Sequence, residues 1–94
     1  MNKIVLKGYI VVPNSDLTAV KEELSVHIDL TRKEEGCLIF EVTQDENENN
    51  KFHVYEEFIN EPAFSNHQQR VGKSKWGSVT KNVDRFYEIT GLKE

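Results

Sequence analysis

The sequence predicts a single α+β domain whose strands and helices follow the order β-α-β-β-α-β, and three observations support this fold class. Residues 37–44 and 51–58 are rich in β-branched and aromatic side chains and flank a polar stretch, which predicts an antiparallel hairpin. Apolar residues recur at helical spacing both after residue 16 and after residue 60. The chain has 94 residues, a length that suits one domain, so we assign residues 1–94 to it.

The N-terminal part begins with a predicted strand from Ile4 to Val12, because this run is rich in β-branched residues and stops at Pro13, which cannot continue a ladder. A turn follows, in which Ser15 or Asp16 is the expected helix N-cap. The first helix then carries its apolar face at Leu17, Val20, Leu24, His27, Ile28 and Thr31. We expect Gly36 to end this helix as a C′ glycine.

The C-terminal part predicts a second helix, a short third one and a last strand. Asn60 is the expected N-cap, with Pro62 near the first helical position, where its missing N–H costs nothing. This helix runs toward Arg70 and places Ala63, Phe64, His67 and Val71 on one face. Residues 72–77 predict a further short helix, and residues 84–90 predict a strand. The result is a ferredoxin-like arrangement, with one antiparallel sheet and two helices on one of its faces.

Both faces of the predicted sheet are largely apolar. The first strand places Ile4, Leu6, Ile10 and Val12 on one face and Val5, Tyr9 and Val11 on the other. The second strand places Leu38, Phe40 and Val42 on one face and Cys37 and Ile39 on the other. Because the helices cover only one face, the other needs a cover, and the sheet of an identical subunit is the simplest one. We therefore expect a homodimer.

Charge and apolar run length argue against two classes of partner. The net charge is −4, with 30% charged residues of both signs, so no basic field would hold the phosphates of a nucleic acid. The run from Met1 to Val12 contains two lysines and is far shorter than the roughly 18 residues of a membrane-spanning helix. We expect a cytoplasmic protein with no membrane partner. The lone Cys37 is expected to behave as a small buried hydrophobe.

Two titratable residues are candidates for catalysis. His67 lies one turn after Phe64 on the apolar face of the second helix, and an imidazole there can titrate near neutrality and act as a base. The alternative is a core histidine satisfied by a backbone carbonyl or a tyrosine hydroxyl. Glu56 lies between apolar residues in the middle of a strand, so it is paired, neutral or directed into a cavity. The alternative for Glu56 is an internal ion pair with Lys7 or Arg85.

Aromatic residues are numerous enough to form either an ordinary core or the walls of a pocket for a flat substrate. The candidate pocket residues are Tyr9, His27, Phe40, Tyr55, Phe64 and Trp76. His27 and Asp29 spell His-x-Asp, but on a helix these positions diverge by about 200°, so they cannot share a metal ion and no metal site is expected. The five glycines form no phosphate loop or dinucleotide fingerprint, and we expect no cofactor.

Several short blocks together resemble the antibiotic biosynthesis monooxygenase family of dimeric α+β barrels, including its quinol monooxygenases. The blocks are Thr31-Arg32, Glu34, Gly36-Cys37-Leu38, Phe40, Tyr55-Glu56 and Ala63-Phe64-x-x-His67. The resemblance covers essentially the whole chain and implies a dimer with a histidine beside its pocket. Branches of the family oxygenate anthrones and quinols without a cofactor, process an autoinducer-derived signal, or degrade haem. The haem branch is disfavoured, because the first strand has Gly8-Tyr9 instead of its asparagine and helix two has His67 instead of its tryptophan.

The resemblance implies a cofactor-independent monooxygenase that oxidises a small electron-rich aromatic, a quinol or an anthrone, with dioxygen. His67 would be the base, and Glu56 its orienter or an alternative base. One alternative function is a cofactor-free isomerase of a small carbonyl signalling metabolite, which would use the same two residues. Another is a dimer that binds a ligand without turning it over.

Overall fold

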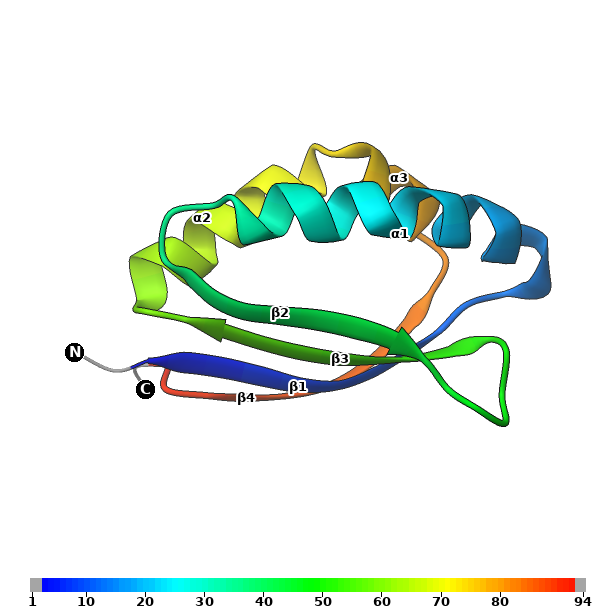
Figure 1. The fold of residues 1–94 in the computed structure, drawn as a ribbon, viewed down its shortest axis with the longest axis horizontal. Coiled ribbons are helices and arrows are strands. Elements are labelled where there is room, and N and C mark those ends of the chain that lie inside the picture. The colour runs from blue at the N-terminus through cyan, green and yellow to red at the C-terminus, as the bar shows by residue number, and fades with distance from the viewer. Residues whose placement is uncertain (1–2, 93–94) are drawn as a thin grey trace.

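The computed structural model describes residues 3–92 and shows two layers, a sheet and a group of helices packed on one of its faces (Figure 1). The strands are β1 (Ile4–Val11), β2 (Cys37–Gln44), β3 (Lys51–Phe58) and β4 (Asp84–Thr90), in the sheet order β2-β3-β1-β4 with antiparallel pairing throughout. The helices are α1 (Leu17–Arg32), preceded by the short turn η1 (Asn14–Asp16), α2 (Glu61–Gly72) and α3 (Lys75–Val79). The predicted α+β class and ferredoxin-like order are confirmed.

The first helix ends earlier than the sequence predicted. Its last residue is Arg32, with Lys33 as the C-cap, so Gly36 is not its C′ glycine but part of the turn that leads into β2. Gly36 has a φ of +89°, and a Cβ there would lie 2.6 Å from the Cβ of Ala63 on α2. Glycine is therefore required at position 36 by its backbone conformation and by the close approach of α2.

The second helix begins where the sequence predicted. The side chain of Asn60 accepts a hydrogen bond of 2.9 Å from the backbone N–H of Ala63, and Pro62 occupies the first turn. Phe64 and His67 are buried on the face of α2 that meets the sheet. The cap therefore fixes where α2 begins and so which of its residues point inward.

The core lies between the helices and the inner face of the sheet. Alternate residues of β3 face this core, and they are Phe52, Val54, Glu56 and Phe58. Strand β3 lies between β2 and β1 and is therefore a central strand of the sheet. Glu56 is the only charged residue in this row, and the other three are apolar. A buried carboxyl group needs a polar partner, so its surroundings are a candidate site.

The start of β2 departs from simple alternation. Cys37 pairs with Phe58 and Ile39 pairs with Glu57, so one extra residue, Leu38, is inserted between two consecutive partners. Leu38 is 52% exposed, whereas Cys37 packs against the core. The predicted placement of Leu38 on the face of Phe40 is therefore wrong, because a bulge shifts the alternation by one residue.

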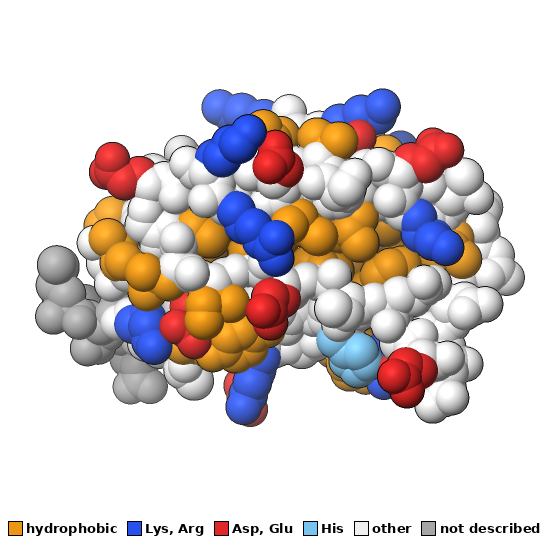
Figure 2. Space-filling view, viewed as in Figure 1, with side chains coloured by type: hydrophobic (Ala, Val, Ile, Leu, Met, Phe, Trp, Pro, Cys, Tyr) orange, Lys and Arg blue, Asp and Glu red, His pale blue; other side chains and the backbone are white. Residues whose placement is uncertain are grey.

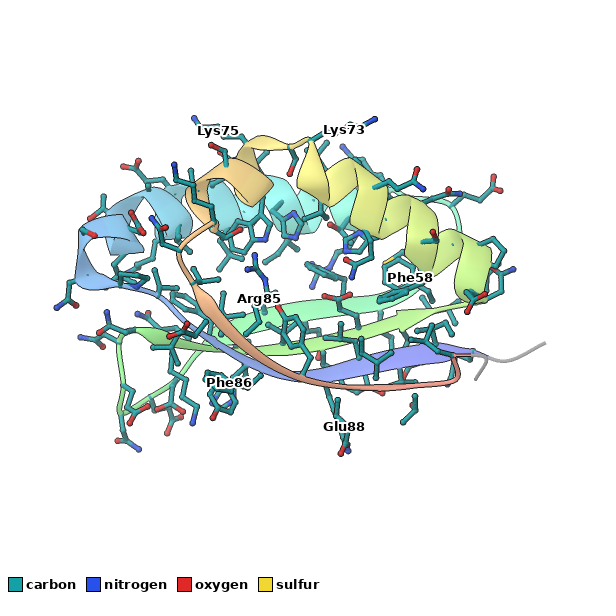
Figure 3. The ribbon with its side chains drawn as sticks, turned by 180° about the vertical axis from the view of Figure 1, so that it is seen from behind. Phe58, Lys73, Lys75, Arg85, Phe86 and Glu88 are labelled. Carbon is teal, nitrogen blue, oxygen red and sulfur yellow. The ribbon has the colours of Figure 1, made fainter. Side chains whose placement is uncertain are left out.

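Within residues 3–92, no helix lies over the outer face of the sheet (Figure 1). On this face the rings of Tyr9 and Phe86 stack with centroids 4.9 Å apart, and Phe86 is 49% exposed. Figure 3 shows Phe86 and Glu88 pointing away from the helices, on this outer side. On the side of the molecule seen in Figure 2, charged side chains of both signs are interspersed with apolar ones and form no single-sign patch.

Candidate functional site

A histidine and two glutamates from separate parts of the chain meet between α2 and the sheet. His67, on α2, is 3% exposed, and its Nδ1 lies 2.9 Å from Oε1 of Glu34, in the turn after α1. A carboxylate only accepts hydrogen bonds, so Nδ1 carries the proton and Nε2 carries the lone pair. Nε2 faces Oε1 of Glu56 on β3 at 3.8 Å, which is beyond hydrogen-bond distance.

Glu34 is held in place from its other side. The guanidinium of Arg70, one turn along α2 from His67, donates from Nε to Oε2 of Glu34 and from Nη2 to the hydroxyl of Thr31 at 2.9 Å. The negative charge of Glu34 raises the pKa of His67, but burial of the imidazole has the larger effect and leaves that pKa below its ordinary value. His67 is therefore an oriented, neutral imidazole at neutral pH.

Glu56 is a buried acid, and one of its carboxyl oxygens lacks a hydrogen-bond partner among the described residues. Its side chain is 8% exposed and Oε1 has no hydrogen-bond partner among the described residues. Burial, and secondly the charge of Glu34, raises the pKa of Glu56 to about 8. Most Glu56 side chains are therefore protonated at pH 7, and the group can either donate or accept a proton near physiological pH.

The ion pairs considered for Glu56 from the sequence do not form. Lys7 lies on the outer face of β1 and its Nζ is 3.7 Å from Glu88. Arg85 does face inward, but its guanidinium donates to the hydroxyl of Thr80 at 3.0 Å. The imidazole of His67, with Nε2 at 3.8 Å from Oε1, is an ionisable neighbour of Glu56.

His27, on α1, is a second buried imidazole in the same region. Its ring stacks on that of Trp76 with centroids 4.5 Å apart and an interplanar angle of 4°, and it meets the ring of Phe40 edge-on at 5.2 Å. Burial, and then the charges of His67 and Arg70, lowers the pKa of His27 to about 3. His27 is therefore neutral at physiological pH, and its Nδ1 has no hydrogen-bond partner among residues 3–92.

A small cavity of about 20 Å³ lies among these groups, and its walls include His27, Phe40, Glu56, Trp76, Arg85 and Tyr87. A space of this size holds about one water molecule. Arg85 and Tyr87 are exposed residues of β4, so the wall that they form is the one nearest to solvent. In Figure 3, Arg85 projects from β4 into the layer between the sheet and the helices.

The structure brings together four of the residues predicted to form a site and separates others from them. Glu56, His27, Phe40 and Trp76 line the cavity, while His67 stands behind Glu56. Phe64 packs against Phe58 with ring centroids 5.7 Å apart and belongs to the core beside the cavity.

Tyr9 and Tyr55 do not lie at this cavity. Both occupy positions of β1 and β3 that alternate to the outer face, where Tyr9 lines a broad groove of about 690 Å³ and Tyr55 donates to Glu57. The expectation that these tyrosines share one pocket with Trp76 is therefore corrected, because the sheet lies between them.

Sequence reasoning assigned no role to Glu34, Arg70 or Tyr87. Glu34 was part of the block that carries the family resemblance, and this was the only signal that pointed to it. It lies in a turn and contacts a residue 33 positions away, so no periodicity reveals the pair.

Within residues 3–92, no three His, Cys, Asp or Glu side chains are grouped so that they could hold a metal ion.

The fold and the buried acid-imidazole cluster define a small α+β protein with a polar site under its helices. The chain belongs to the antibiotic biosynthesis monooxygenase family, whose model matches residues 4–75. No curated protein matches the chain. None of the helices in the described part of the chain is long and apolar enough to cross a membrane.

Solved structures share this fold at low sequence identity. A protein from Nitrosomonas europaea, provisionally named an antibiotic biosynthesis monooxygenase, has a TM-score of 0.81 and 19% identity over 97% of this chain and 90% of its own. One from Deinococcus radiodurans with the same provisional name has a TM-score of 0.79 and 22% identity, over 97% of this chain and 93% of its own. MupZ from Pseudomonas fluorescens has a TM-score of 0.76 and 24% identity, over 99% of this chain and 71% of its own. At these identities the similarity establishes the fold.

Proposed function

We propose that the protein is a cofactor-independent monooxygenase that oxidises a small electron-rich aromatic bearing a hydroxyl group, a quinol or an anthrone, with dioxygen. The family membership supports the reaction class. The observation that carries the proposal is the position of Glu56. Its residue borders an aromatic-walled cavity, its Oε1 has no hydrogen-bond partner among residues 3–92, and the oriented imidazole of His67 lies 3.8 Å from that oxygen. A cytoplasmic location stays a prediction from the sequence.

The chemistry requires a base and a site that excludes water. Once an anthrone or quinol has lost a proton, the electron-rich anion can itself reduce dioxygen. For an anthrone the overall change is balanced without another reductant: the methylene group loses two hydrogens and gains one oxygen as a carbonyl, and the second oxygen leaves as water. General base catalysis of the deprotonation contributes typically 10²–10⁴-fold.

Glu56 is the better candidate for the group that meets the substrate. The sequence favoured His67 as the base, but in the structure Glu56 lines the cavity and His67 does not. A carboxylate with a pKa of about 8 is matched to a proton transfer near neutral pH. His67 then acts through Glu56: its Nε2 lone pair can receive the proton, and Glu34 stabilises the imidazolium that results.

Substrate binding must enlarge the cavity, because about 20 Å³ cannot hold an aromatic ring. The wall most easily moved is that of Arg85 and Tyr87, since both are exposed residues of the edge strand β4. The guanidinium of Arg85 donates a hydrogen bond to the hydroxyl of Thr80 at 3.0 Å, and this bond would have to break. We propose that the ring enters from this side and displaces these two side chains.

A homodimer is part of the same proposal. The outer face of the sheet exposes apolar side chains next to the groove lined by Tyr9 and Phe86. A second copy of the sheet would bury them, and the sequence predicted such a partner from the apolar character of both faces.

Oxygen consumption by the purified, metal-stripped protein against a panel of hydroquinones and anthrones tests the proposal. Uptake should require substrate and should fall at least about tenfold in Glu56→Gln and in His67→Ala. Glu57→Gln is the matched control, because Glu57 is the neighbouring residue on the outer face and should leave the rate unchanged.

Two outcomes would contradict the oxygenase proposal. Conversion of a carbonyl compound without oxygen, lost in the same two variants, would indicate the isomerase. Saturable binding with no turnover under either condition would indicate a ligand-binding protein.

A further inference from the structure

Two residues that line the cavity each have a buried polar atom without a hydrogen-bond partner among the described residues. Among residues 3–92, Nδ1 of His27 and Oε1 of Glu56 are the buried side-chain atoms that lack one, and both residues line the space of about 20 Å³. Their side chains come from α1 and β3, on opposite layers of the fold. An unsatisfied buried polar atom is costly, so two of them at one cavity point to a missing group between them.

We infer that His27 and Glu56 form a seat for one hydroxyl group of an aromatic ligand. The inference rests on the proposed function for the aromatic character of the ligand and adds the group by which the ligand is recognised. The cavity is about the size of one oxygen atom with its hydrogen. The ring itself would lie beyond it, toward Tyr87.

A hydroxyl satisfies both atoms in a way that other oxygen groups do not. It donates one hydrogen bond and accepts others, so it can accept from a protonated Glu56 and donate to the lone pair of a neutral imidazole. When Glu56 is ionised, the hydroxyl donates to the carboxylate instead, which is the arrangement that proton removal needs. An ether or an aryl fluoride has no proton to donate, and an anionic group would meet the charge of Glu34 close by.

The aromatic surroundings favour a ring attached to that hydroxyl. His27 stacks on Trp76 and meets Phe40 edge-on, so the two walls next to the seat are flat and apolar. A phenol would place its oxygen between the two polar atoms and its ring against these side chains. An aliphatic alcohol would satisfy the polar atoms but would make less contact with the rings.

Binding of two size-matched ligands tests the seat. Trp76 is the only tryptophan of the chain, so its indole N–H signal in a ¹H–¹⁵N NMR spectrum is unique and lies beside the cavity. The protein is titrated under nitrogen at pH 6.5 with 4-methoxyphenol and with 4-fluoroanisole, in which fluorine replaces the hydroxyl at similar size. We expect 4-methoxyphenol to bind at least about fivefold more tightly. A smaller preference, or no effect of the phenol on the Trp76 signal, would overturn the inference.

Two variants test whether His27 causes the preference for 4-methoxyphenol over 4-fluoroanisole. His27→Phe keeps a ring beside Trp76 but has no Nδ1, so it should bind both ligands with nearly equal affinity. The control is His53→Phe, which replaces an exposed histidine on the outer face and should keep the preference. If His27→Phe loses the dispersed amide spectrum of a folded protein, the comparison of the two ligands on the unmodified protein decides.

The binding test is separate from the test of catalysis. A hydroxyl preference without oxygen uptake would support the seat and contradict the oxygenase proposal. Oxygen uptake with no hydroxyl preference would support the oxygenase proposal and contradict the seat.

Discussion

His67 and Glu34 are 33 positions apart in the chain, and their side chains meet at 2.9 Å between Nδ1 and Oε1. This contact joins the turn after α1 to the inner face of α2. It also fixes the tautomer of the imidazole, so that Nε2 presents its lone pair to Glu56. The hydrogen bond thus connects the packing of the two helices with the protonation of the site.

Replacing the carboxylate of Glu34 should weaken both the fold and the orientation of His67. We expect Glu34→Gln to lower the free energy of unfolding by about 1–3 kcal/mol, because Arg70 and His67 each lose a charged acceptor. Burial already lowers the pKa of His67, and the charge of Glu34 partly opposes this effect. Removing that charge should therefore lower the pKa further. Urea denaturation at pH 7 measures the first effect and NMR titration the second. Glu35→Gln is the control, because Glu35 is the exposed neighbour of Glu34. This variant should have the same free energy of unfolding and the same pKa of His67 as the unmodified protein.

Stability should decrease between pH 6.5 and pH 8 because of Glu56. Its pKa is raised from 4.5 to about 8 on folding, so its contribution is complete below pH 4.5 and is lost as the pH rises toward 8, by at most about 1.4 kcal/mol per pH unit. His27 and His67 have lowered pKa values, so they act in the opposite direction and only below their ordinary value of 6.5.

Denaturation curves at pH 6.5, 7.25 and 8 would show this decrease. Glu56→Gln should remove most of it, while Glu57→Gln should retain it, because the pKa of Glu57 is lowered and its carboxylate is already ionised throughout this range. If the free energy of unfolding of Glu56→Gln fell with pH as steeply as that of the unmodified protein, the decrease could not be attributed to Glu56.

The edge strand β4 should be displaced by a side chain at Gly8. A Cβ there would lie 1.9 Å from the backbone oxygen of Phe86, so Gly8→Ala should destabilise the protein by more than about 1 kcal/mol. Gly72→Ala is a matched control, because a Cβ at this helical position meets nothing within 4 Å. It should be neutral or stabilising by up to about 1 kcal/mol. Thermal unfolding of both variants, followed by circular dichroism, distinguishes these results.

The proposed dimer should depend on the outer face of the sheet. Phe86→Lys places a charge where a second sheet would pack, so light scattering coupled to gel filtration should give the mass of a monomer. Val26, 46% exposed on α1, is a comparably exposed apolar residue in the helix layer. Val26→Lys should therefore leave the dimer intact. A monomeric unmodified protein, or a dimeric Phe86→Lys variant, would contradict the proposal.

Much of the fold could be predicted from local patterns. The bounds of β2, β3 and β4 agree with the sequence prediction, and the apolar face of α2 was predicted residue by residue. These features follow from short-range periodicity and from caps such as Asn60. The bulge at Leu38 and the early end of α1 could not be predicted in this way, because both depend on how the turn after α1 packs against α2.

The sequence alone determined the α+β class, the order of the elements and the inward direction of His67 and Glu56, because each depends on the alternation or periodicity of neighbouring residues. Only the tertiary structure decided that Glu34 orients His67, that Glu56 rather than His67 borders the cavity, and that Tyr9 and Tyr55 lie on the other face. It also decided the protonation states of Glu56 and His27. These properties arise from burial and from contacts between residues distant in the chain, and no local pattern in a sequence records them.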